Sequence, residues 1–144
     1  MDDDHYAPRP VAGWYSAAAV ASLLFMLLGC AVYVMHAYTD PATLPLDQRA
    51  MFEAEPQWVT AAMGLGSLAA AAGAVMLLLR RKAAVPLMLV SLIVILVWFA
   101  GLFAVARLRD VLSTNDIAVS VLVAALTWTI FWFARHSRQR GWLR

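Results

Sequence analysis

Four long stretches of this 144-residue chain carry no ionised side chain, and this pattern limits the fold more than any other feature. The uncharged stretches are 10–39, 56–79, 83–106 and 117–134, and all 20 Lys, Arg, Asp and Glu residues lie outside them. A helix needs about 20 residues, within a range of about 17–25, to cross a hydrocarbon core of about 30 Å. Each stretch can therefore cross a membrane once as a helix, and none is long enough to cross twice.

The composition agrees with a membrane protein. Hydrophobic residues make up 63% of the chain and charged residues 14%, against about 45–50% and about 25% in soluble domains. A soluble fold of this length could not bury so much apolar surface, so we predict an all-α integral membrane protein, a four-helix antiparallel up-and-down bundle. The same composition excludes a disordered chain and a free nucleic-acid binder, and the single cysteine excludes a disulfide scaffold.

A single membrane domain is expected over residues 1–144. Two prolines and a glycine shorten the first stretch, because they place the start of its helix near Trp14. The expected spans are 14–37, 58–79, 83–106 and 117–134, followed by a basic cytoplasmic tail at 135–144. Because only residues 80–82 separate the second and third spans, these two helices must be antiparallel neighbours.

Positively charged residues are divided unequally between the two expected sides of the membrane. Four spans place the N-terminus, the loop at 80–82 and the C-terminus on one side, together with eight of the 11 Lys and Arg residues. Positive residues resist translocation, so we predict that both termini are cytoplasmic, in a bacterial inner membrane. The expected contacts with anionic lipid headgroups on that side are made by Arg80, Arg81, Lys82, Arg135, Arg138 and Arg140.

The loop at 44–56 joins the first two spans on the expected outer side. Its Leu46, Ala50 and Ala54 would share one face of a short helix that ends before Pro56. This face predicts a helix lying on the outer membrane surface. A solvated, partly ordered loop is the alternative.

The second span is rich in Ala and Gly. Its small residues recur at steps of four, and they are Ala62, Gly66, Ala70 and Ala74, with Ala69 four residues before Gly73. In lipid, small residues let helix backbones approach closely, and this drives helix association. These six residues form the candidate helix-packing interface, either inside the protein's own bundle or towards a second copy or a partner in a larger membrane complex.

Aromatic side chains fall into two groups. Those at the expected span ends are typical of interfacial anchors, and they are Trp14, Tyr15, Tyr38, Trp58 and Trp142. Others, including Trp98 and Trp128, lie deeper in the third and fourth spans, where such spacing usually reflects packing or lipid contact. A slot for a pigment, quinone or lipid is the alternative, and we expect no bound cofactor.

The spans lack the side chains that most chemistry requires. They contain no Asp, Glu, Lys or Arg, and the three histidines are scattered without the spacing of a metal site. His36, near the outer end of the first span, is expected to be an interfacial side chain. We therefore predict no catalytic residue, no metal site and no enzymatic activity.

Leu27-Leu28-Gly29-Cys30 has the form of a bacterial lipoprotein cleavage site, which would lipidate Cys30 and leave three spans. Such a signal has a positively charged start, whereas this N-terminus is acidic, and the apolar sequence continues to Ala37. We therefore expect an unprocessed first span.

Several loose motifs give the chain a family resemblance. They are Gly29-Cys30 with Tyr33, Leu44-Pro45, Pro56 with Trp58, Leu77-Leu78-Leu79-Arg80-Arg81-Lys82, Ser91-Leu92 and Gly141-Trp142-Leu143. With them the chain resembles a set of small four-helix bacterial inner-membrane proteins often labelled sugar transporters, over most of its length after residue 13. The resemblance implies the four-helix fold. The Trp-Asn pair of that family's first helix is replaced here by Phe25-Met26, so a polar group that a transport path would use is missing.

Two functions are compatible with these features. The first is a non-catalytic inner-membrane protein acting through helix association, as an accessory or stabilising subunit or as a self-associating bundle. The second is a small-solute, sugar-like transporter working as an oligomer. A sugar site needs several converging hydrogen-bonding groups, whereas these spans offer mainly scattered hydroxyls that usually bond their own backbone. The first function is therefore favoured.

Overall fold

The computed structural model describes residues 10–110 and 112–144, apart from the side chains of Asp47, Arg107 and Leu108. The elements in chain order are α1 (Tyr15–Tyr38), the 3₁₀-helix η2 (Pro41–Thr43), α2 (Leu46–Ala54), α3 (Gln57–Leu78), α4 (Ala84–Ala104), α5 (Ala106–Arg109) and α6 (Thr114–Gln139). Within these residues there is no strand, and four helices, α1, α3, α4 and α6, are long and apolar enough to cross a membrane. The predicted all-α class with four spans is confirmed.

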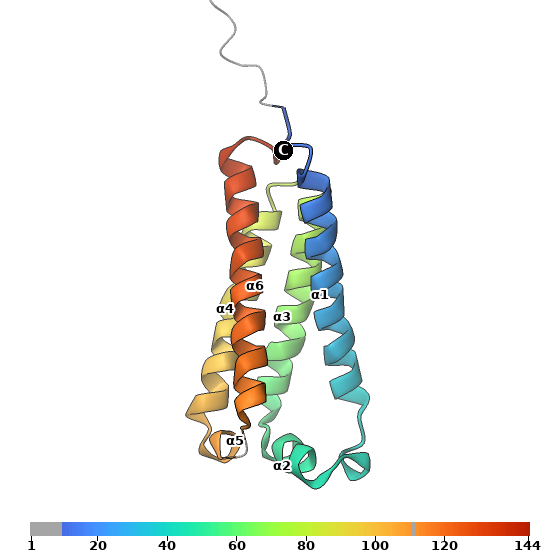
Figure 1. The fold of residues 1–144 in the computed structure, drawn as a ribbon, viewed down its shortest axis with the longest axis vertical. Helices are drawn as coiled ribbons and strands as arrows, with labels where there is room; N and C mark the ends of the chain where they lie inside the picture. The colour runs from blue at the N-terminus through green and yellow to red at the C-terminus, as the bar shows by residue number, and fades with distance from the viewer. Residues whose placement is uncertain (1–9, 111) are drawn as a thin grey trace, which may run out of the picture.

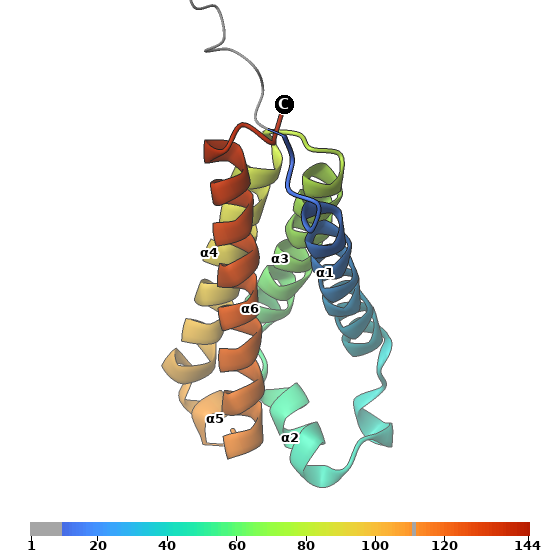
Figure 2. The same ribbon diagram turned by 45° about the horizontal axis from the view of Figure 1, so that its top comes forward.

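The four long helices form an antiparallel bundle (Figure 1). Both described chain ends and the α3–α4 turn lie at one end of it, which we call the terminal end, and α2 and α5 lie at the other. Helix α3 packs closely against α4 and against α1, and α4 also packs against α6. Figure 2 shows α1 and α6 diverging towards the α2 end. The bundle is therefore an arc of four helices, in the order α1, α3, α4 and α6, rather than a closed ring.

Local sequence signals explain where α6 begins and ends. At its start, Ser113 Oγ accepts a hydrogen bond from the Asp116 backbone N–H at 3.2 Å, and the Asp116 carboxylate accepts one from the Ser113 backbone N–H at 3.0 Å. This capping box satisfies backbone donors that the first helical turn leaves free. At its end, Gly141 takes a left-handed conformation (φ 72°) and reverses the chain.

Helix α6 extends further than the predicted fourth span. It continues to Gln139, so half of the expected tail is helical, and the last residues fold back onto the bundle. The backbone N–H of Arg144 donates to the carbonyl of Arg80 at 2.6 Å, and the N–H of Lys82 donates to the carbonyl of Arg144 at 2.9 Å. The chain end is therefore held against the α3–α4 turn by two backbone hydrogen bonds.

Aromatic side chains close the terminal end of the bundle. Tyr15 and Trp142 are 1% and 8% exposed. The centroid of the Tyr15 ring lies 5.4 Å from that of Phe133 and 5.8 Å from that of Trp142. The Tyr15 hydroxyl also donates to the carbonyl of Leu77 at 2.6 Å. The interfacial-anchor prediction is thus wrong for Tyr15 and Trp142, because the folded-back chain end covers both rings.

The side of the membrane that holds the terminal end stays a prediction, and labelling can test it. Cys30 is the sole cysteine, so in a Cys30→Ala background the exposed residues Gln139 and Asn115 can each be changed to cysteine. If both termini are cytoplasmic, a membrane-impermeant maleimide added to intact cells should label Asn115→Cys and spare Gln139→Cys, with both labelled after permeabilisation. The opposite labelling pattern in intact cells would invert the predicted orientation.

Candidate functional site

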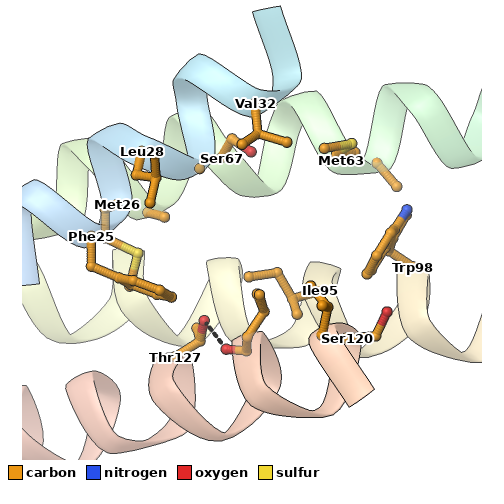
Figure 3. Close-up of a pocket in the computed structure, with 15 residues that line it drawn as sticks. Phe25, Met26, Leu28, Val32, Met63, Ser67, Ile95, Trp98, Ser120 and Thr127 are labelled. Carbon is orange, nitrogen blue, oxygen red and sulfur yellow. Dashed lines mark hydrogen bonds between the residues drawn. The ribbon is translucent and has the colours of Figure 1, made fainter. Parts of the chain in front are cut away.

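A cavity of about 330 Å³ lies between the four long helices near the middle of their lengths. We call it the inner cavity, and Figure 3 shows its lining. Its walls come from α1 (Phe25, Met26, Leu28, Gly29, Val32), α3 (Ala62, Met63, Ser67, Ala70), α4 (Ile95, Trp98) and α6 (Val119, Ser120, Val123, Thr127). This volume falls at the small end of the range of about 300–1,000 Å³ that is typical of ligand sites.

The lining of the inner cavity is almost entirely apolar. Two of its three hydroxyl groups bond their own helix, because Ser120 donates to the carbonyl of Asp116 and Thr127 to that of Val123, each at 2.8 Å; the third belongs to Ser67. The carbonyl of Ser67 accepts a hydrogen bond from the thiol of Cys30 at 3.2 Å, which joins α1 to α3 beside the cavity. The cavity therefore suits a hydrocarbon better than a polar solute.

The inner cavity opens sideways between α1 and α6. These two helices face each other across it, and three lining residues on them, Leu28, Val32 and Val119, are exposed at its rim. In a bilayer, this opening would face the lipid chains, because it lies along the apolar middle of two spans. A hydrophobic molecule can therefore enter from the membrane without crossing water.

A second cavity, of about 300 Å³, lies at the α2 end, and we call it the end cavity. It shares Met63 and Trp98 with the inner cavity, so the two spaces adjoin at these side chains. The remaining lining residues are His36, Thr39, Leu44, Gln48, Met51, Phe52, Glu55 and Leu102. Unlike the inner cavity, the end cavity carries ionisable and amide groups.

The polar centre of the end cavity is a His36–Glu55 pair. His36 Nε2 lies 3.1 Å from Glu55 Oε2, and the Thr60 hydroxyl donates to Glu55 Oε1 at 2.9 Å. The imidazole also lies against the Phe52 ring, with 4.3 Å between centroids. Phe52 of α2 and Glu55, the residue after α2, lie over the end of α1, so His36 has partners within the protein; its interfacial location stays a prediction.

Helix α2 turns two of the three residues of its predicted membrane-facing surface outwards, and the third, Ala54, is half-buried. Leu46 and Ala50 are exposed, whereas Met51 and Phe52 are half-buried against the end cavity. The segment is a helix over Leu46–Ala54, so the alternative of a partly ordered loop is not what the structure has. The outward position of Leu46 agrees with contact to a membrane surface.

The two glycines of the predicted small-residue face of α3 lie against α4. A Cβ atom at Gly66 would approach Val94 Cγ1 to 3.2 Å, and one at Gly73 would approach Met88 Cγ to 3.2 Å and Leu87 Cβ to 3.3 Å. Ala70 and Ala74 are buried in the core, Ala69 is half-buried, and Ala62 and Ala70 line the inner cavity. These residues therefore make close contacts inside this chain.

The predicted lipid-contacting cations all lie at the terminal end. Arg81, Lys82, Arg135, Arg138 and Arg140 are exposed, whereas Arg80 is half-buried with its guanidinium 5.5 Å from the centre of the Tyr15 ring. Because these cations gather at one end of the bundle, we still expect this end to contact anionic lipid headgroups. Arg80 differs from the others because it also contacts the aromatic cluster.

Sequence reasoning missed both cavities and the His36–Glu55 pair. The lining residues of α1 are 63 to 102 positions away from those of α4 and α6, so no local pattern brings them together. Among the described residues, no group of three or more His, Cys, Asp or Glu side chains could hold a metal ion.

Comparisons with known proteins add no functional assignment. No family model, curated protein or solved structure matches this chain. The resemblance to small four-helix inner-membrane proteins therefore stays a prediction.

Proposed function

We propose that this multi-pass membrane protein is a non-catalytic binding protein for a lipid, whose hydrocarbon chain occupies the inner cavity. The observation that carries the proposal is an apolar cavity bounded by all four spans and open between α1 and α6. Burial of a hydrocarbon chain there removes it from neighbouring lipid without requiring any polar group of the protein to lose its hydrogen bonds. Such a protein would present or sequester a lipid within the inner membrane.

The alternatives predicted from the sequence fit the cavity less well. A sugar would need several free hydrogen-bonding groups, yet the Ser120 and Thr127 hydroxyls in the cavity already bond their own helix. Association through the small-residue face would compete with α4, which already covers Gly66 and Gly73.

Gly29→Leu tests the proposal by filling the inner cavity. Gly29 lines the cavity in the middle of α1, and a Cβ atom there would meet nothing within 4 Å, so a leucine can be added without strain. We expect native mass spectrometry of protein purified in mild detergent to show a bound lipid, and the variant to lose at least about 90% of it. Leucine is also a better helix former than glycine, by roughly 0.8 kcal/mol, so the fold should persist.

Ala31→Leu is the matched control for Gly29→Leu. Ala31 is exposed on the same helix, two residues away, and does not line the cavity. This variant should keep its bound lipid. Equal lipid retention by Gly29→Leu and Ala31→Leu would refute the proposed function.

A further inference from the structure

The two ends of the inner cavity differ, and this difference orients a bound lipid. Towards the terminal end, the lining residues Met26 and Ala70 belong to a buried apolar core that continues to Tyr15, Phe133 and Trp142. At the α2 end, it adjoins the end cavity at Met63 and Trp98. A lipid whose hydrocarbon chain lies in the inner cavity can therefore extend its polar head into the end cavity, towards His36 and Glu55.

The end cavity has free capacity to bind oxygen atoms of a ligand. If His36 Nε2 donates its hydrogen to Glu55, then Nδ1 of a neutral imidazole is an acceptor. Among the described residues, each Glu55 carboxylate oxygen has one partner, and a carboxylate offers about four acceptor positions in all. The indole N–H of Trp98 can act as a donor at the junction of the two cavities. These groups match hydroxyl and carbonyl oxygens.

The charge of the end cavity disfavours an anionic head. Glu55 is an acid on its wall, and the lining side chains that the structure describes include no Lys or Arg. Arg49 of α2 is already paired with Glu53, with 2.7 Å between Nε and Oε1. Among the described lining residues, a phosphate in this cavity would meet the Glu55 carboxylate and no Lys or Arg, and two negative charges within one cavity repel each other.

Resting on the proposed function, we propose that the bound lipid has a single hydrocarbon chain and an uncharged head bearing hydroxyl or carbonyl oxygens, and that His36 and Glu55 bind this head in the end cavity. The hydrocarbon chain of the lipid then lies among the middle segments of the spans, and its head lies at their α2 end. This arrangement matches the orientation of a lipid in one leaflet, with its head near the membrane surface.

Two lipids with the same chain test the selectivity for an uncharged head. Monoolein has a glycerol head, and 1-oleoyl lysophosphatidic acid differs from it by a phosphate. In titrations of the full-length protein followed by native mass spectrometry, monoolein should bind at least about tenfold more tightly, because Glu55 repels the phosphate. Decylubiquinone tests a carbonyl head in the same assay. Tighter binding of either neutral probe than of the phosphate lipid supports the proposal, and failure of both to bind more tightly overturns it.

Glu55→Gln tests whether the carboxylate is the source of this selectivity. Glutamine keeps the size of the side chain and its hydrogen bond with Thr60, but removes the charge. We expect the preference for monoolein over the phosphate lipid to fall by about tenfold. Glu53→Gln is the control, because Glu53 is an exposed acid two residues before Glu55, and this variant should keep the preference for monoolein. If the preference is unchanged in Glu55→Gln, then the lipid head does not lie beside Glu55.

His36→Ala tests the hydrogen bond to the head. Loss of one hydrogen bond should weaken monoolein binding by roughly three- to tenfold. His136→Ala, at the terminal end, is the control and should bind as the unmodified protein does. Gly29→Leu should abolish binding of every probe, whatever its head. If Gly29→Leu abolishes binding while the Glu55 and His36 variants behave as the unmodified protein, the head assignment fails and the proposed function stands.

Discussion

Gly73→Leu should destabilise the bundle by forcing α3 away from α4. A Cβ atom at this position already approaches Met88 Cγ to 3.2 Å and Leu87 Cβ to 3.3 Å, and the rest of a leucine side chain must fit into the same interface. Leu87 Cβ is fixed to the α4 backbone, so the two helices must separate. Overpacking of this kind destabilises by roughly 1–3 kcal/mol. Thermal unfolding of the protein in mild detergent should show a melting temperature lower by at least about 5 °C.

Ala72→Leu is the matched control for Gly73→Leu. Ala72 is the preceding residue on α3 and is exposed, so the added leucine would face lipid. Its melting temperature should stay close to that of the unmodified protein. Equal melting temperatures for the two leucine variants would mean that α3 and α4 do not pack as closely as the structure has them.

Trp142→Ala should be the most destabilising change near the chain end. The Trp142 side chain is 8% exposed and packs on Tyr15 and Trp14, with centroid separations of 5.8 and 5.9 Å. Its removal leaves a cavity and uncovers the buried Tyr15 ring. Tryptophan-to-alanine changes in cores destabilise by about 3–5 kcal/mol. The same thermal unfolding measurement should show a fall larger than that of Gly73→Leu.

Trp128→Ala separates this effect from a general loss of aromatic residues. Trp128 lies on α6 with its side chain 58% exposed, in the part of the helix that faces lipid. Its removal should lower the melting temperature by less than half as much as the removal of Trp142. If Trp142→Ala unfolds at the same temperature as Trp128→Ala, then the chain end does not contribute to the bundle's stability.

The four spans could be predicted because each is a local property of the chain. Twenty or so uncharged residues require a helix in a membrane, where every backbone polar group must be bonded within the segment. The expected spans at 14–37 and 58–79 therefore differ by only one residue at each end from α1 and α3. The fourth differs more, because Arg135 and Arg138 ended the uncharged stretch although nothing in them prevents a helix from continuing to Gln139.

The candidate site could not be predicted because it depends on contacts between distant segments. His36 became a partner of Glu55 only when α2 folded over the end of α1. Tyr15 and Trp142 had the sequence positions of interfacial anchors, yet Gly141 turns the chain so that Trp142 covers Tyr15. Hydropathy describes how apolar a side chain is, and it does not describe which other side chain will cover it.

The sequence by itself determined the membrane class, the number of spans and their approximate limits, because charge and length act on each segment separately. Only the tertiary structure decided that the four helices form an arc instead of a closed ring, which leaves the inner cavity open between α1 and α6. Helix association in lipid depends on close fit between whole surfaces, and the small residues of α3 direct that fit towards α4. The inner cavity lies where α1 and α6 diverge and no longer pack against each other.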